Sequence, residues 1–324
     1  MTAAGTGQDL PDLAAIRSAA ARIAPHVHRT PVMTCAAIDA EVGATLFFKC
    51  EHLQRVGAFK ARGACNAVFS LDARTASRGV VTHSSGNHGA ALAYAARRRG
   101  IPAWVVMPES APAVKQANVR RFGATVRLCA PTIAARETAC DEVARESGAT
   151  LIHPFDDPRV IAGQGTAALE LVESVAGLDA VVAPCGGGGL LSGTSIAANG
   201  VRDGIEVFGA EPANADDAVR SLASGSLQPL APTTTIADGL RTMLSPRTLA
   251  AIRAYVDAIG ICSEAAIVHA MRILFERMKQ VVEPSGAVPL ACLLERTLDV
   301  GGKRVGIIIS GGNVDLDRLP WQTR

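Results

Sequence analysis

Residues 180–198, AVVAPCGGGGLLSGTSIAA, predict a strand, a turn and a helix in immediate succession. The first six residues form a short apolar run typical of a buried strand, and four glycines separate it from a helical stretch. A strand that passes through a short turn into a helix is the repeating unit of a parallel sheet covered by helices.

The same succession recurs on both sides of this stretch. Short apolar runs predict strands at residues 44–50, 79–84, 103–108, 124–129, 180–185, 206–211 and 304–310. Helical stretches lie between them, at residues 89–99, 111–122, 133–147, 165–175 and 263–280. This alternation predicts an α/β fold with open parallel sheets. No low-complexity linker divides the chain, so we expect a second lobe to be inserted into the first rather than appended.

The composition is that of an ordinary globular protein. The 324 residues are 48% hydrophobic and 19% charged, with a net charge of +2 and dispersed signs, which gives no nucleic-acid-binding or membrane-binding surface. The apolar runs are too short to span a bilayer, and the first residues lack the layout of a secretory signal, so we expect a cytoplasmic protein. The eight cysteines are scattered, which favours reduced thiols over zinc sites or disulfides.

Two motifs early in the chain suggest a reactive amine and an anion site. Residues 58–64, AFKARGA, place Lys60 among aromatic and small residues. A lysine that forms a Schiff base must be desolvated enough to lose its proton, although a lone lysine is usually only a surface charge. In residues 82–96, THSSGNHGAALAYAA, a strand leads through small polar residues into a helix. The free N–H groups of that helix suit a carboxylate, and the motif has more small polar residues than a cap requires.

Two later motifs suggest a phosphate site and a ring partner. The glycines of PCGGGGLLSG, residues 184–193, can form an amide-lined nest for a phosphate, although a flexible loop has the same composition. The motif lacks the spacing of the P-loop and of the dinucleotide-binding fingerprint. In IIISGGNVD, residues 307–315, the Ser310 hydroxyl ends a buried strand and suits a neutral pyridine nitrogen. An ordinary strand-terminal turn is the alternative.

In this order, the four motifs resemble the fold-type-II pyridoxal-phosphate (PLP) enzymes, which have the tryptophan synthase beta-like fold, and within them the serine racemase and serine/threonine dehydratase group. The resemblance extends from about Ile16 to Asp315 and includes HPFDDPRVIAGQGT, GAEPANADDA, TIADG and EPSGA. It implies two open parallel-sheet domains with the cofactor in the cleft. The large PLP-binding domain would comprise residues 1–68 and 157–324, and a small mobile domain residues 69–156. A homodimer and a small amino-acid substrate are also implied.

The resemblance assigns a role to each matching residue. Lys60 would bind PLP covalently and later act as a base on the substrate α-carbon, while Ser310 would face the pyridine nitrogen. Asn87 would bind the 3′-oxygen of the ring, and the glycines would bind the phosphate through their amides. The cofactor site so implied consists of Phe59, Lys60, Asn87, Gly186, Gly187, Gly188, Gly189, Glu283 and Ser310.

The implied substrate site is less specific. The substrate carboxylate would lie in the loop of Ser84, Ser85, Asn87 and His88. Ser85 matches the serine proposed in serine racemases as the acid/base opposite the lysine, but dehydratases of the group also carry it, so racemisation stays open. Arg136 aligns with an arginine that contacts a second carboxylate in relatives, and a solvated helix arginine is the alternative. Thr242 aligns with a serine near the bound ligand in serine racemases.

A metal site is implied by GAEPANADDA, residues 209–218. Glu211, the Ala215 carbonyl and Asp217 match the divalent-cation ligands of the family. Oxygen ligands suit Mg²⁺, Mn²⁺ or Ca²⁺ rather than zinc. An acidic helix start is the alternative explanation.

The activity implied is that of a PLP-dependent ammonia-lyase, a dehydratase that converts L-serine or L-threonine into a 2-keto acid and ammonia. Phe155 replaces an asparagine found in animal serine racemases and weakens a pure racemase interpretation. A serine or aspartate racemase and a 3-hydroxyaspartate dehydratase remain the alternatives. The context of Lys60 argues against β-replacement, and the retention of Lys60 and Ser310 argues against a catalytically silent binding protein. Nucleotide regulation is not decided by the sequence.

Overall fold

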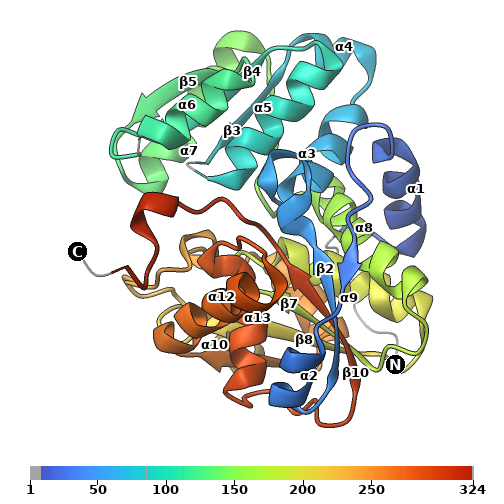
Figure 1. Ribbon diagram of the computed structural model, residues 1–324. Coiled ribbons are helices and arrows are strands. Elements are labelled where there is room, and N and C mark those ends of the chain that lie inside the picture. The colour runs from blue at the N-terminus through green and yellow to red at the C-terminus, as the bar shows by residue number, and fades with distance from the viewer. Residues whose placement is uncertain (1–8, 85, 112, 323–324) are drawn as a thin grey trace.

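The computed structural model describes residues 9–84, 86–111 and 113–322, which form two sheets flanked by helices (Figure 1). In the larger sheet the strands follow the order β1 (Val32–Met33), β2 (Thr45–Cys50), β10 (Arg304–Ile309), β7 (Ala180–Pro184), β8 (Glu206–Pro212) and β9 (Ala258–Cys262). In the smaller sheet the order is β5 (Thr125–Cys129), β4 (Ala103–Pro108), β3 (Val80–His83) and β6 (Thr150–Leu151). Among these strands, β1 pairs antiparallel and the others pair in parallel. The predicted α/β fold with parallel sheets is confirmed.

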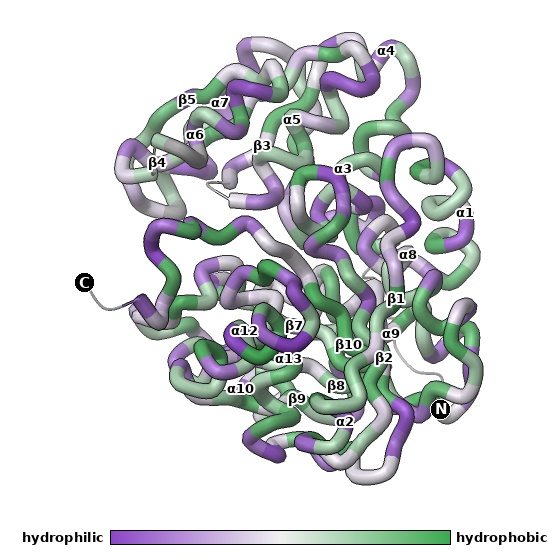
Figure 2. Tube along the Cα trace, viewed as in Figure 1, coloured by the Kyte–Doolittle hydropathy of each residue, from purple (hydrophilic) through white to green (hydrophobic). Residues whose placement is uncertain are grey.

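Helices cover both faces of the larger sheet. The helices of the first half are α1 (Leu13–Ile23), α2 (Ala36–Val42), α3 (Lys60–Phe69), α4 (Ala73–Ser77), α5 (Asn87–Arg99), α6 (Ala113–Arg121) and α7 (Ile133–Ser147). Those of the second half are α8 (Pro158–Ser174), α9 (Gly189–Val201), α10 (Asp217–Ser224), α11 (Pro246–Tyr255), α12 (Glu264–Met278) and α13 (Pro284–Leu294). One core cluster lies between the sheet and α2, α12 and α13, and a second between the sheet and α1, α8, α9 and α11. Figure 2 shows hydrophobic residues concentrated along the strands of the larger sheet.

The seven predicted strands are present, whereas the short strands β1 and β6 and the strand β9 were missed. The predicted start of the helix at residue 165 was also wrong, because α8 begins at Pro158, where the Asp157 carboxylate accepts from the Arg159 amide at 2.8 Å. Glycines inside α8 hide the helical pattern, but they are needed for packing. A Cβ atom at Gly163 would lie 2.6 Å from the Gly63 Cα on α3, and one at Gly165 would lie 2.6 Å from the Gly193 carbonyl oxygen on α9.

A buried ionic cluster fixes the beginning of α3. The Arg62 side chain is fully buried and donates from Nε to Glu51 at 2.7 Å and from Nη1 to Glu170 at 2.8 Å. Lys49 donates to the same Glu170 at 2.6 Å. Removing one partner of such a cluster leaves an uncompensated buried charge, so the cluster holds α3, and with it Lys60, in one orientation.

The strands of the smaller sheet all lie between residues 80 and 151, inside the sequence of the larger lobe. The domain boundaries and the mobility of the smaller lobe stay predictions. None of the helices in the described part of the chain has the length and apolar character needed to cross a membrane.

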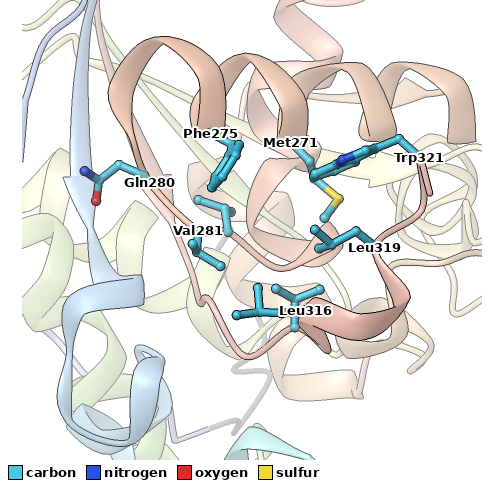
Figure 3. A pocket seen from close by; sticks show the side chains of 9 residues that line it. Met271, Phe275, Gln280, Val281, Leu316, Leu319 and Trp321 are labelled. Atoms are coloured by element: carbon cyan, nitrogen blue, oxygen red, sulfur yellow. The ribbon is translucent and has the colours of Figure 1, made fainter.

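The C-terminal segment packs against α12. Leu316, Leu319 and Trp321 face Met271 and Phe275 across a small apolar cavity (Figure 3). The cavity measures about 10 Å³, which is at most the room of one water molecule. It is therefore a packing feature rather than a ligand site.

Candidate active site

Lys60 lies at the first position of α3, at the junction of the two lobes. Its Nζ atom donates to the Pro154 carbonyl oxygen at 2.8 Å and lies 5.0 Å from the centre of the Phe59 ring. Desolvation by the surrounding protein lowers the pKa of Lys60 to about 8. At this pKa a useful fraction of the amine is uncharged near neutral pH, which is the form that attacks an aldehyde.

Ser310 and Gly311 lie beside the two residues that precede this lysine, and Glu283 lies next to Gly311. The Ser310 carbonyl oxygen accepts from the Phe59 amide at 2.9 Å, and Ala58 forms a bridge with Gly311. The Ser310 side chain is buried at the end of β10. Glu283 lies close to Gly311, because a Cβ atom at position 311 would lie 2.3 Å from the Oε1 atom of Glu283. The structure thus brings together two motifs that are some 250 residues apart in the sequence.

Asn87, at the start of α5 in the smaller lobe, contacts Glu283 and Asn313 of the larger lobe. Its side-chain amide donates to the Glu283 Oε1 atom at 2.8 Å, and its carbonyl oxygen accepts from Asn313 at 2.9 Å. The backbone amide of Asn313 also donates to the Glu283 Oε2 atom, at 3.2 Å. Asn313 lies in the SGGNVD motif but was not predicted as a site residue. Only the contact to Asn87 from the other lobe identifies it.

The four glycines form a tight turn at the N-terminus of α9. Gly188 has a φ of +83°, and a Cβ atom there would lie 2.7 Å from side-chain atoms of Leu244 and Thr248. A Cβ atom at Gly187 would lie 2.5 Å from the Phe155 ring, and one at Gly186 would lie 2.9 Å from the Leu240 Cα. The turn is therefore rigidly packed, which argues against a flexible loop. Its amides and the first N–H groups of α9, which lack partners within the helix, form a cradle that fits a phosphate.

The predicted carboxylate loop follows β3. The Ser84 hydroxyl accepts from the Gly86 amide at 3.2 Å, and His88 is buried, with its Nε2 atom 3.3 Å from the Ile152 carbonyl oxygen. Burial holds the pKa of His88 well below its usual value, so this imidazole is neutral at physiological pH. Ser85 lies outside the described residues, and its proposed role stays a prediction.

Arg136 is on α7 and lies near the start of this loop. Burial lowers the pKa of His83, at the end of β3, and the charge of Arg136 lowers it further. The Nε atom of Arg136 is buried and has no hydrogen-bond partner among the described residues. The residue as a whole is half-buried, so the contact to a second carboxylate and the solvated helix arginine both stay predictions. Thr242, in contrast, is exposed in the segment before α11.

His153 was not predicted and lies between Lys60 and the loop. Its Nδ1 atom accepts from the Asp156 amide at 2.9 Å, and its ring contacts that of His83 edge-on, with ring centres 5.6 Å apart. Burial lowers the pKa of His153 to about 4, so the ring is neutral and carries its proton on Nε2. The HPFDDP string alone gave no reason to single it out.

Two buried carboxylates, those of Glu211 and Asp217, line the implied metal site. Both Glu211 oxygens accept backbone amides, from Ala218 at 3.2 Å and from Val219 at 2.9 Å. Both Asp217 oxygens are buried without a hydrogen-bond partner in the described part of the protein. Ala215, two positions earlier in the sequence, is also buried. Burial raises the pKa of Glu211 to about 9 and that of Asp217 to about 6. Buried, unpaired carboxylate oxygens are unfavourable unless a cation or a proton compensates them, so this pair fits a divalent cation. Among the residues described, however, no cluster of three or more His, Cys, Asp or Glu side chains could ligate a metal.

Comparisons with known proteins agree with this arrangement. A family model described as "Pyridoxal-phosphate dependent enzyme" matches residues 23–311. The chain is 50% identical over 300 residues to the beta-hydroxyaspartate dehydratase of Paracoccus denitrificans (strain Pd 1222), covering 93% of this chain and 95% of that protein. It is 48% identical to the maize serine racemase structure, with a TM-score of 0.93 and 95% of each chain covered. The T.th. threonine deaminase structure is 46% identical, with a TM-score of 0.90, covering 94% of this chain and 99% of that one.

A reactive, desolvated lysine, a rigid phosphate cradle and a strand-terminal serine thus coincide in one site with a family match over most of the chain. The chain belongs to the family of PLP-dependent enzymes of fold type II that contains the serine racemases and their relatives.

Proposed function

We propose that the protein is a PLP-dependent ammonia-lyase whose preferred substrate is 3-hydroxyaspartate. The observation that supports this substrate is the position of Arg136, whose Nε atom is buried without a partner among the described residues, beside His83 at the start of the carboxylate-binding loop. A substrate with a second carboxylate would supply the missing acceptor. The relative from Paracoccus denitrificans, with 50% identity, is named for this activity.

Different residues of this chain would bind the cofactor, bind the substrate and transfer the α-proton. PLP, when bound, holds the substrate amine and withdraws electrons from the α-carbon. Lys60 would hold the cofactor through its amine, and this amine, whose pKa burial lowers to about 8, would take the α-proton of the substrate. The glycine turn would hold the phosphate, and the loop that begins at Ser84 would hold the α-carboxylate. Loss of the β-hydroxyl as water and hydrolysis of the remaining enamine give the 2-keto acid and ammonia.

Ser310 influences which reaction follows proton removal. A serine hydroxyl cannot protonate a ring nitrogen as an aspartic acid would, so negative charge at the α-carbon is less well stabilised. Where Ser310 faces the ring nitrogen of the bound cofactor, prompt departure of the β-hydroxyl would be favoured. This supports elimination as the main reaction of the site.

A serine racemase is the second candidate. The maize serine racemase structure matches with a TM-score of 0.93, and the sequence retains Ser85 for proton transfer on the face opposite Lys60. L-Serine and L-threonine remain candidate substrates for elimination as well, as the threonine deaminase relative suggests.

We also propose that Glu211, the Ala215 carbonyl and Asp217 bind Mg²⁺, or Mn²⁺ or Ca²⁺, and that the protein is a cytoplasmic homodimer. The support for the metal is the buried carboxylate of Asp217, which has no partner among the described residues. Exposed apolar side chains of Phe275, Val281 and Leu316 lie together around the cavity of Figure 3 and provide surface that association would bury.

The test of the substrate is keto-acid release from L-serine, L-threonine and both diastereomers of L-3-hydroxyaspartate. We expect a higher kcat/KM for hydroxyaspartate, and we expect Arg136→Met to lower that value about 10- to 100-fold while leaving serine turnover nearly unchanged. Arg145→Met, an exposed arginine on the same helix, is the matched control and should change neither.

Other outcomes would redirect the assignment. Equal losses on serine and hydroxyaspartate in Arg136→Met would contradict a role on the second carboxylate. No keto acid from any substrate would exclude the ammonia-lyase, and chiral analysis of serine would then test the racemase.

A further inference from the structure

The glycine turn lies between two walls from distant parts of the sequence. One wall is the segment of residues 153–157, here called the strap, which connects β6 to α8. Its Phe155 is packed so tightly that Cβ atoms at Gly187 and Gly189 would lie 2.5 and 2.9 Å from it. The other wall is the start of α11, where Leu244 and Thr248 contact Gly188.

The strap also contacts the reactive lysine. The Pro154 carbonyl oxygen is the acceptor of the Lys60 amine, at 2.8 Å, and the next residue is the Phe155 that covers the glycines. A displacement of the strap would therefore move the lysine's hydrogen-bond acceptor and one side of the phosphate cradle together.

Arg247 joins the two walls. Its Nη1 atom donates to the Asp156 carboxylate and, at 3.1 Å, to the Asp156 carbonyl oxygen. The two residues are separated by 91 positions in the sequence, one on the strap and one in the first turn of α11. We call this ion pair the clasp.

The location of Arg247 is unfavourable for the helix itself. Ser245 is the N-cap of α11 and Pro246 its first residue, so Arg247 is the second residue of the helix. A positive charge at that end opposes the helix dipole, where aspartate or glutamate would be favoured. The Nε atom of Arg247 is moreover buried without a partner among the described residues. Local helix stability does not explain this arginine, whereas its contacts to the strap do.

We propose that the Asp156–Arg247 clasp is a positioning device for the cofactor site: it holds the strap against the glycine turn and so sets both the phosphate cradle and the acceptor of Lys60. Neither residue is a catalytic residue in this proposal, because both act through Pro154 and Phe155. The proposal rests on PLP dependence, which the two candidate functions share, and it does not depend on the choice of substrate.

Both side chains of the clasp are partly exposed, at 25% and 30%, so the pair itself adds little to global stability. Arg247→Gln should consequently leave the melting temperature of the apoprotein almost unchanged. It should weaken PLP binding about five-fold in an equilibrium titration and alter the visible circular dichroism of bound PLP, which reports the cofactor's orientation. Asp156→Asn should act in the same direction but more weakly, because the carbonyl contact of Arg247 remains. Arg247→Lys, which keeps the charge, should recover most of the affinity.

The matched control is Glu41→Gln. It breaks the Glu41–Arg277 pair, whose side chains are 35% and 36% exposed and which joins α2 to α12 rather than the walls of the turn. PLP affinity and the circular dichroism signal should not change in this variant.

Native PLP affinity and an unaltered circular dichroism signal in both clasp variants would overturn the proposal. An equal loss of affinity in Glu41→Gln would also contradict it, because that result indicates a general effect of charge loss. A failure of Arg247→Lys to recover binding would contradict it as well, because the restored ion pair would then not restore the cofactor site. Should Arg247→Gln not fold, Asp156→Asn decides the question with the same measurements. Because PLP binding is measured without substrate, a failure of the substrate assignment would leave these results unaffected.

Discussion

At the scale of single residues, the site depends on side chains and glycines whose surroundings change their ordinary chemistry. Lys60 has a pKa lowered to about 8 by desolvation, and His153 has one lowered to about 4. The sequence identified Lys60 by its motif, but no pattern along the chain marked His153. Its neutral state follows from burial between the two lobes, which is a property of the folded protein.

Gly188 provides a test of the cradle. Alanine at Gly188 and alanine at Gly100 should both cost about 1–2 kcal/mol of stability, because both positions have positive φ values, +83° and +73°. Only at Gly188 would the new Cβ atom also meet Leu244 and Thr248, at 2.7 Å, whereas Gly100 has open space. We therefore expect Gly188→Ala to weaken PLP binding in an absorbance titration and Gly100→Ala to leave it unchanged. Equal PLP affinity in the two variants would show that the turn tolerates displacement.

At the scale of elements, the end of β8 and the first turn of α10 form the candidate metal site. Glu211 lies near the C-terminus of β8, and its carboxylate oxygens accept hydrogen bonds from backbone amides in the first turn of α10. Asp217 is the first residue of α10. The sequence supplied these residues only through the family resemblance. What the structure adds is that the Asp217 oxygens lack partners among the described residues, which no sequence pattern could predict because it depends on the packing around them.

This arrangement predicts a pH-dependent effect of metal removal. Burial raises the pKa of Glu211 to about 9 and that of Asp217 to about 6, so without a cation the folded protein binds more protons than the unfolded chain between about pH 4 and pH 9. Above about pH 7 the buried histidines, such as His88 and His153, no longer titrate in either state, so the free energy of unfolding should fall as the pH rises from about 7 to 8 when EDTA is present. Mg²⁺ should restore the melting temperature at pH 8 and change it little at pH 5.

Asp217→Asn should reduce both the pH slope and the response to Mg²⁺. Glu276→Gln, which removes an exposed carboxylate, should affect neither. In EDTA, a melting temperature that stays constant or increases between about pH 7 and pH 8 would contradict the site.

At the scale of the whole molecule, the chain crosses between the two sheets and brings distant segments to one junction. Lys60, the glycine turn, Ser310 and Glu283 come from four parts of the sequence that the larger sheet and its helices hold together, and Asn87 comes from the smaller lobe. The C-terminal segment returns to the larger lobe and packs on α12 (Figure 3). It lies against the core but contributes no described residue to the candidate cofactor site.

Removal of residues 316–324 should therefore affect stability and not the cofactor. Leu319 and Trp321 would leave the apolar surface of Met271 and Phe275, which we expect to lower the free energy of unfolding by about 2–3 kcal/mol. The melting temperature and PLP affinity of the truncated chain would be measured side by side. Asp317→Asn, at an exposed position of the same segment that does not line the cavity, is the control and should change neither. A truncation that loses PLP affinity at an unchanged melting temperature would disprove this separation.

The α/β fold and the family could be predicted from the sequence, because strands, glycine turns and helix starts are local patterns and each motif lies within a few residues. The roles of the motif residues in the cofactor site stay predictions. The Asp157 cap and Pro158 are local signals for the start of α8, whereas the close contacts of Gly163 with α3 and of Gly165 with α9 exist only in the tertiary structure. The tertiary structure also decided the burial of the Arg136 Nε atom and the clasp between Asp156 and Arg247. These features depend on contacts between residues far apart in the chain, and burial and charge at such contacts exist only once the chain has folded.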